Sequence, residues 1–274
     1  MTQGFTRPFT PSGNAAMAHA LPWKFAGDLL LIHFRAAPEA LARYLPEPLE
    51  PLDDSGECFL WSPRLTCHPV DMDPATMDPG QTGYNVCVIG IPARLNGEPT
   101  MFSAFQWCDK DWLIVLSWFI GATSKGAEFQ DTSRHELIGR IGSPLDGAFG
   151  HPIRRTVSRF GNRVVDMGYT PEREIAMDAL SFYTALLPLT GMRHMPDLTI
   201  PPSGRPPVHD LVQQIMRDTS FGTPTTGPAT LKFGEGPNEE LLPIQPLETI
   251  AGYSIPMTMV LEGIRVVHDY NARS

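Results

Sequence analysis

The sequence contains four lysines, and one of them, Lys125, stands where an amine could carry out carbonyl chemistry. It follows an apolar, aromatic run and lies in a turn of small residues, GATSKGA at 121–127. If the fold buries this turn, desolvation lowers the pKa of the amine below its usual value of about 10.4. A neutral amine attacks a carbonyl carbon to form a Schiff base, which starts amine-catalysed decarboxylation, aldol cleavage and dehydration. The alternative is an ordinary turn lysine that points to water, the commoner state of this residue type.

Other catalytic and metal-binding signatures are missing from the sequence. No Gly-x-Ser-x-Gly segment indicates a hydrolase nucleophile. None of the four cysteines stands in the C-x-x-C spacing of a zinc or dithiol site. His194 and His209 flank a proline-rich segment and could meet in space, but we interpret them as loop or surface histidines. We therefore expect neither a metal nor a cofactor.

Composition excludes several classes of partner. The chain has 30 acidic and 21 basic residues, a net charge of −9, and no basic run, which argues against nucleic acid and against a membrane-surface helix. No apolar stretch reaches the roughly 18 residues that would span a membrane. The first 22 residues lack the apolar segment of a secretory signal. We therefore expect a cytoplasmic globular protein with free thiols.

The apolar runs and turn residues predict a mainly β fold. Asn96-Gly97 is typical of a tight hairpin, and a second hairpin is predicted around Gly161-Asn162. The predicted strands include 28–34, 84–92, 101–107, 112–120 and 255–268; short helices are predicted at 38–45 and 208–217; and 181–187 fits either type. The strands from 84 to 120 would form an antiparallel meander that leads directly to Lys125. With no evident linker, residues 22–274 are predicted to form one domain behind an N-terminal extension, residues 1–21.

Four segments, in order along the chain, resemble the acetoacetate decarboxylase superfamily. The most specific are the PEPLE motif at 46–50 and the strand-to-lysine segment that ends at Lys125. The others are the PWKF motif at 22–25, the GPATL motif at 227–231 and the VVHDY motif at 266–270. This resemblance implies an α+β fold centred on an antiparallel β-barrel with a few short helices. It also implies a homo-oligomer and a reactive lysine, mapped onto Lys125, that points into the barrel.

The sequence departs from the family pattern at several pocket positions. The second lysine of the family falls on Gly126, a pocket glutamate on Val86, and a pocket arginine near Asp28. A further glutamate maps to the region 59–61, which has no carboxylate. These departures predict a more apolar pocket and a carbonyl or oxo-acid substrate other than acetoacetate.

The candidate site residues follow from this mapping. Lys125 is the catalytic candidate, and Tyr253 is a replacement acid/base whose alternative is a core tyrosine. The substrate-binding candidates are Val86, Trp107, Thr123 and Ser124. Two functions stay open. One is a cofactor-independent Schiff-base lyase, acting by decarboxylation or by aldol and dehydration chemistry. The other is a non-catalytic binding protein for a hydrophobic small molecule on the same barrel.

Overall fold

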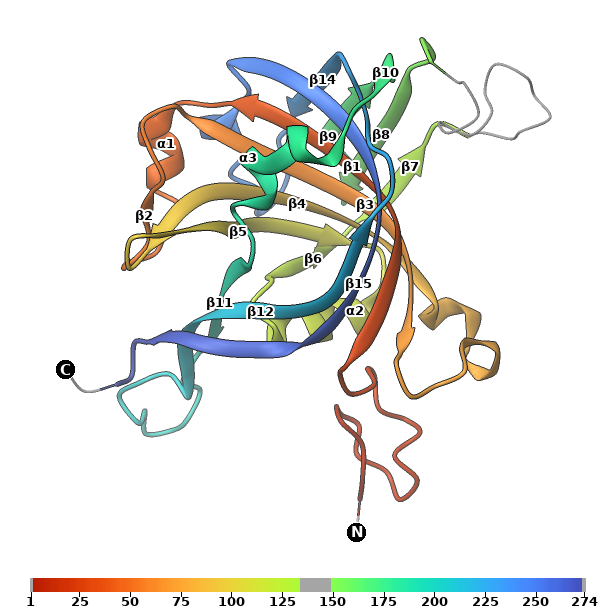
Figure 1. Cartoon of the computed structure of the whole chain (residues 1–274). Coiled ribbons are helices and arrows are strands. Elements are labelled where there is room, and N and C mark those ends of the chain that lie inside the picture. Colours follow the sequence, from red (N-terminus) through yellow and green to blue (C-terminus); the bar gives the residue numbers. More distant parts are fainter. Residues whose placement is uncertain (1, 134–148, 273–274) are drawn as a thin grey trace.

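Two β-sheets make up most of the fold in the computed structural model, which describes residues 2–133 and 149–272 (Figure 1). In the larger sheet, hydrogen-bonded neighbours follow the order β1, β3, β4, β5, β11, β12 and β15, and β15 also pairs with β1. The ring of strands therefore closes on itself. These strands are β1 (Trp23–Arg35), β3 (Glu57–Pro69), β4 (Gly83–Leu95), β5 (Glu98–Cys108), β11 (Leu189–Met195), β12 (Val208–Phe221) and β15 (Glu248–Asp269).

Short elements extend this ring, and a smaller sheet covers part of its outer face. The short strands are β2 (Glu50–Pro51), β6 (Ser124–Gly126), β10 (Arg173–Glu174) and β13 (Thr225–Gly227). The four-stranded sheet contains β7 (Glu128–Asp131), β8 (Ile153–Arg159), β9 (Asn162–Tyr169) and β14 (Ala229–Phe233). The α-helices are α1 (Pro38–Ala42), α2 (Asp111–Phe119) and α3 (Ser181–Thr184). None of the helices in the described parts of the chain is long and apolar enough to cross a membrane.

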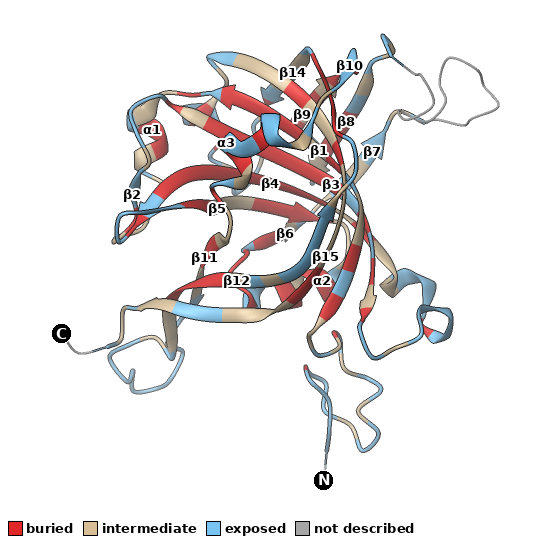
Figure 2. Cartoon of the chain, viewed as in Figure 1, coloured by how far each residue is buried: buried red, intermediate tan, exposed pale blue. Residues whose placement is uncertain are grey.

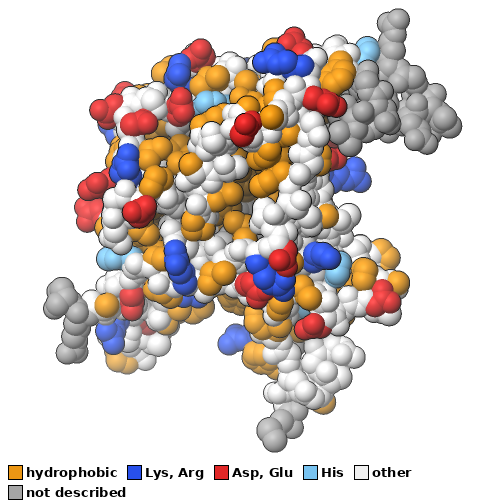
Figure 3. Space-filling view, in the orientation of Figure 1, with side chains coloured by type: hydrophobic (Ala, Val, Ile, Leu, Met, Phe, Trp, Pro, Cys, Tyr) orange, Lys and Arg blue, Asp and Glu red, His pale blue; other side chains and the backbone are white. Residues whose placement is uncertain are grey.

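Strand β1 separates the two largest clusters of the hydrophobic core. Successive side chains of a strand point to opposite faces. Leu29 and Leu31 face the interior of the ring, whereas Ile32 and Phe34 face the layer between the ring and the smaller sheet. Both faces are covered, so the strand reads as a nearly continuous apolar run, and Figure 2 shows buried residues along β1, β3 and β4. Figure 3 shows hydrophobic side chains gathered in the middle of one face of the molecule, with charged side chains around its edge.

The predicted hairpins are confirmed, and so is the mainly β fold with few helices. Asn96 and Gly97, with φ of 54° and 86°, join β4 to β5 as a tight hairpin turn requires. Phe160 and Gly161 join β8 to β9 in the same way. The ambiguous segment 181–187 contains the short helix α3.

Two element predictions are wrong. The run 112–120 is helix α2 rather than a third meander strand; its buried side chains recur at helical spacing, at Trp112, Leu113, Leu116 and Ser117. A continuous apolar run has no periodicity that separates a strand from a buried helix. The segment 208–217 is part of strand β12 rather than a helix, because it pairs with β11 on one side and β15 on the other. Tertiary pairing therefore overrode the local pattern.

Candidate functional site

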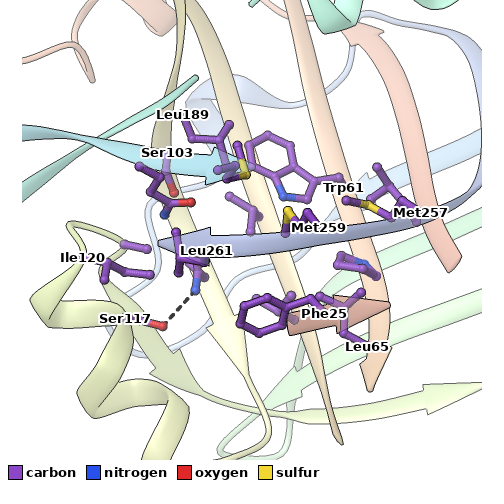
Figure 4. A pocket seen from close by; sticks show the side chains of 18 of the residues that line it. Phe25, Trp61, Leu65, Ser103, Ser117, Ile120, Leu189, Met257, Met259 and Leu261 are labelled. Atoms are coloured by element: carbon purple, nitrogen blue, oxygen red, sulfur yellow. Dashed lines mark hydrogen bonds between the residues drawn. The ribbon is translucent and has the colours of Figure 1, made fainter. Parts of the chain in front are cut away.

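An apolar cavity of about 140 Å³ lies inside the ring of strands (Figure 4). Its walls come mainly from β1, β3, β4, β5, α2, β12 and β15. The lining side chains are mostly aliphatic, aromatic and methionine, including Phe25, Trp61, Tyr84, Met257 and Met259. Such a cavity holds a small, mainly apolar molecule by shape and by removal of apolar surface from water.

Several polar side chains line the cavity, among them Ser103, Gln106, Ser117, Gln214 and Thr219, and Gln106 and Ser117 belong to a hydrogen-bonded cluster. Gln106 Nε2 donates to Ser117 Oγ at 3.2 Å and to Ser124 Oγ at 2.5 Å. Ser103 also lines the cavity, and its Oγ is buried with no hydrogen-bond partner among the described residues. In Figure 4, Ser103 and Ser117 lie on one side of the cavity and Met257 on the other.

No charged side chain of the described residues lines this cavity. Among the described residues that line it, none is Asp, Glu, His, Lys or Arg. Its two tyrosines, Tyr84 and Tyr183, have pKa values raised by burial, so both phenols stay neutral at physiological pH. The described parts of the chain also contain no group of three or more His, Cys, Asp or Glu placed to hold a metal.

The turn after α2 determines which residue of β6 faces the cavity. Gly121, with φ of 83°, ends the helix, and Ala122 N donates to Ser117 O at 2.8 Å, the pattern of a Schellman cap. Strand β6 then pairs in parallel with β5, with Ser124 opposite Gln106 and Lys125 opposite Trp107. Because side chains alternate along a strand, Ser124 shares the cavity side with Gln106. Lys125 lies on the opposite face, with Trp107.

The Lys125 amine is therefore placed differently from what the family resemblance implied. It does not point into the ring, and neither it nor any of the other three lysines lines the cavity. Its Nζ lies 3.0 Å from Glu239 Oε2 and also donates to the Asn238 carbonyl. The Lys125 side chain is 28% exposed, whereas that of Glu239 is fully buried.

Glu239 is the centre of a second polar cluster on this outer face. Its Oε1 accepts a hydrogen bond from Trp107 Nε1 at 3.2 Å and lies 3.5 Å from an Arg159 nitrogen. Two cations thus compensate one buried carboxylate, as buried charges require. The Lys125 amine is thus engaged by Glu239 and by the Asn238 carbonyl, on the face opposite the cavity.

Some of the other predicted site residues lie at the cavity and the rest lie outside it. Val86 lines the cavity, and Ser124 adjoins it through Gln106. Trp107 is fully buried in the layer between the sheets, and Thr123 is exposed. Tyr253 is half-buried on β15 outside the cavity lining; burial raises the pKa of its phenol. The structure therefore brings together Val86 and Ser124, and leaves the other candidates outside.

Trp61 lines the cavity in the region where the resemblance implied a glutamate, and Asp28 is exposed outside it. The polar residues Ser103, Gln106 and Ser117 were not predicted as site residues. Their signal in the sequence is an isolated polar residue between apolar ones, as at Ser103 and Gln106 in MFSAFQW at 101–107. A buried polar side chain must find a partner or a ligand.

Comparisons with known proteins identify relatives that share this fold. A family model described as acetoacetate decarboxylase matches residues 6–271. A search of curated protein sequences found no match. The enduracididine biosynthesis enzyme MppR, complexed with the condensation product of pyruvate and imidazole 4-carboxaldehyde, is 26% identical with a TM-score of 0.85, over 99% of this chain and 98% of that one.

Two further solved structures share the fold. An acetoacetate decarboxylase-like enzyme from Sphingomonas wittichii RW1 is 22% identical with a TM-score of 0.87, over 97% of this chain and 100% of that one. Acetoacetate decarboxylase from Legionella pneumophila is 15% identical with a TM-score of 0.75, over 93% and 91% of the two chains. At these identities the two likenesses show a shared fold. Since the family model covers nearly the whole sequence, the chain belongs to the acetoacetate decarboxylase family.

Proposed function

We propose that this family member binds a neutral, mainly apolar small molecule non-covalently in the cavity inside the ring. The observation that carries the proposal is the lining itself, in which no described residue is an acid, a base or a lysine. A charged ligand would lose its hydration there without gaining a counter-ion. A neutral ligand would gain from the apolar walls.

The size of the cavity limits the ligand. Its volume of about 140 Å³ is close to the roughly 150 Å³ of an engineered apolar cavity that binds benzene. We therefore expect ligands of about the size of a single six-membered ring with a short substituent. Larger molecules would require the walls to move.

A second candidate function is a cofactor-independent lyase in which Lys125 forms a Schiff base with a carbonyl or oxo-acid substrate. Family membership and the condensation product held by the related MppR favour it. In this mechanism Lys125 has to leave Glu239, lose a proton and reach a substrate from the face opposite the cavity. The chemistry would be decarboxylation, or aldol and dehydration chemistry.

Calorimetric titration with toluene and with benzoate tests the first proposal. We expect toluene to bind and benzoate, its charged counterpart, not to bind. The variant Val86→Trp, which fills the cavity, should abolish toluene binding, and the matched variant Lys24→Met on the exposed face of β1 should leave it unchanged. Absence of toluene binding to the folded wild-type protein would overturn the proposal.

Borohydride reduction in the presence of pyruvate, acetone and short aldehydes tests the second candidate. We expect no stoichiometric adduct in the wild-type protein. A reduced adduct that maps to Lys125 by mass spectrometry, together with turnover that Lys125→Met removes, would establish the lyase instead.

A further inference from the structure

We propose that Ser103 and Gln106 recognise one hydroxyl group on a single-ring aromatic ligand, an inference that rests on the proposed binding function. The ligand class is a small neutral aromatic alcohol. Its ring would occupy the apolar part of the cavity, and its oxygen would lie at the side formed by β5.

The first observation is the unpaired hydroxyl of Ser103. Its Oγ is buried and has no hydrogen-bond partner among the described residues, although the side chain lines the cavity. A buried hydroxyl without a partner is unfavourable, and most such groups in proteins are bonded. Since a hydroxyl offers one donor and two acceptor sites, Ser103 can donate to the oxygen of a ligand hydroxyl, whose own proton stays available for an acceptor.

The second observation is that the cluster beside Ser103 is already fixed. Both bonds made by Gln106 Nε2 go to protein hydroxyls, those of Ser117 and Ser124. Because its amide donors are occupied, the carboxamide is held in one orientation and its Oε1 remains as an acceptor for a ligand donor. No hydrogen bond to that oxygen occurs among the described residues. An oriented acceptor next to a free hydroxyl suits one small polar group.

A β-bulge places both residues on the same side. The pairing of β4 with β5 shifts between Ile89 and Gly90, so that Gly90 pairs with Ser103 and Ile89 with Phe105. The extra residue, Ala104, breaks the simple alternation of side chains. Ser103 and Gln106 therefore both line the cavity, although they stand three positions apart.

The walls opposite this polar side favour an aromatic ring. Three methionines, Met216, Met257 and Met259, line the cavity together with aromatic side chains such as Phe25 and Trp61. Methionine sulfur makes favourable contacts with aromatic rings and adapts to their shape. Aromatic side chains add offset or edge-to-face contacts with a ligand ring.

The test compares three probes by calorimetry: benzyl alcohol, toluene and cyclohexylmethanol. We expect Ser103→Ala to weaken benzyl alcohol binding about five-fold, the usual effect of one net hydrogen bond, and to leave toluene binding unchanged. We expect benzyl alcohol to bind more tightly than cyclohexylmethanol. Ser158→Ala, on β8 outside the cavity lining, is the matched control and should change none of the three affinities.

Each outcome has a separate meaning. If toluene binds but Ser103→Ala leaves benzyl alcohol affinity unchanged, the recognition by Ser103 is refuted while the proposed binding function stands. If the non-aromatic alcohol binds as well as benzyl alcohol, the aromatic specificity is refuted. If no probe binds to folded wild-type protein, the proposed function itself fails. Ser103→Ala removes an unpaired hydroxyl, so its melting temperature should not fall, and a loss of affinity cannot be ascribed to misfolding.

Discussion

Replacing Lys125 by Met separates a structural role of this amine from a catalytic one. Methionine keeps much of the apolar stem and removes the charge. In the folded protein the change removes the 3.0 Å ion pair with Glu239 and the hydrogen bond to the Asn238 carbonyl. If these contacts are the function of Lys125, the variant loses stability and retains the binding properties of the cavity.

The size of the loss follows from how the partners are buried. Breaking a fully buried ion pair costs about 3–5 kcal/mol, because a charge is left without compensation. Here Lys125 is 28% exposed, and Glu239 keeps Arg159 and Trp107 as partners. We therefore expect Lys125→Met to lower the free energy of unfolding by about 1–2 kcal/mol. Glu239→Gln leaves two cations facing a neutral amide, so we expect a larger loss of about 3 kcal/mol.

Urea unfolding and toluene titration of the same samples provide the assay. The double variant should be less destabilised than the sum of the two single changes, since the pair is broken only once. Lys24→Met is the matched control, because Lys24 is exposed and forms no ion pair among the described residues. The free energy of unfolding of this variant should differ from that of the wild type by less than about 0.5 kcal/mol. The reasoning is refuted if Lys125→Met keeps full stability but loses a Schiff-base adduct or turnover that the wild type has.

Three further predictions concern the cavity and the core. Ser124→Lys places an amine on the cavity side at a position that is 2% exposed, so desolvation should lower the pKa of that amine. We expect borohydride reduction with acetone to trap an adduct at position 124. A variant that folds but traps no adduct there would contradict the assignment of residue 124 to the cavity face. Gly90→Ala should weaken toluene binding in calorimetry, because a Cβ at this position would clash with the Trp61 ring and push it into the cavity; unchanged affinity would contradict this packing. Burial lowers the pKa of His33 below 6.5, against the opposing effect of Glu57. The unfolded chain therefore binds more protons between the folded pKa and 6.5, so stability is greatest above 6.5 and falls as the pH drops through this window. The variant His33→Phe keeps the stacking on Phe59 and removes the titrating group. Urea unfolding at pH 8 and pH 5 should show a smaller loss of unfolding free energy at pH 5 in this variant than in the wild type. An equal loss in the variant and the wild type would contradict the prediction.

The parts of the fold that the sequence predicts are those determined by local chemistry. The hairpin at Asn96-Gly97 follows from two residues that tolerate positive φ, and the strand within 28–34 follows from an apolar run covered on both faces. The two wrong predictions lie where tertiary structure decides. The run 112–120 is apolar except for Ser117, so its pattern does not separate a strand from a helix. The segment 208–217 becomes a strand because two neighbouring strands pair with it.

The same limit applies to the site, and there it concerns a single residue. The sequence places Lys125 at the end of the segment that carries the family resemblance, but it does not state which face of a three-residue strand that lysine occupies. A shift of one residue in strand register moves every side chain to the other face. In the structure the turn at Gly121 and the pairing of Ser124 with Gln106 set that register. As a result the neutral hydroxyl of Ser124, rather than the amine of Lys125, adjoins the cavity. Val86 and Trp61 line the same cavity at positions where the family resemblance implied carboxylates. The absence of charge at these positions is therefore consistent across the described lining, and it is the reason for proposing a neutral ligand.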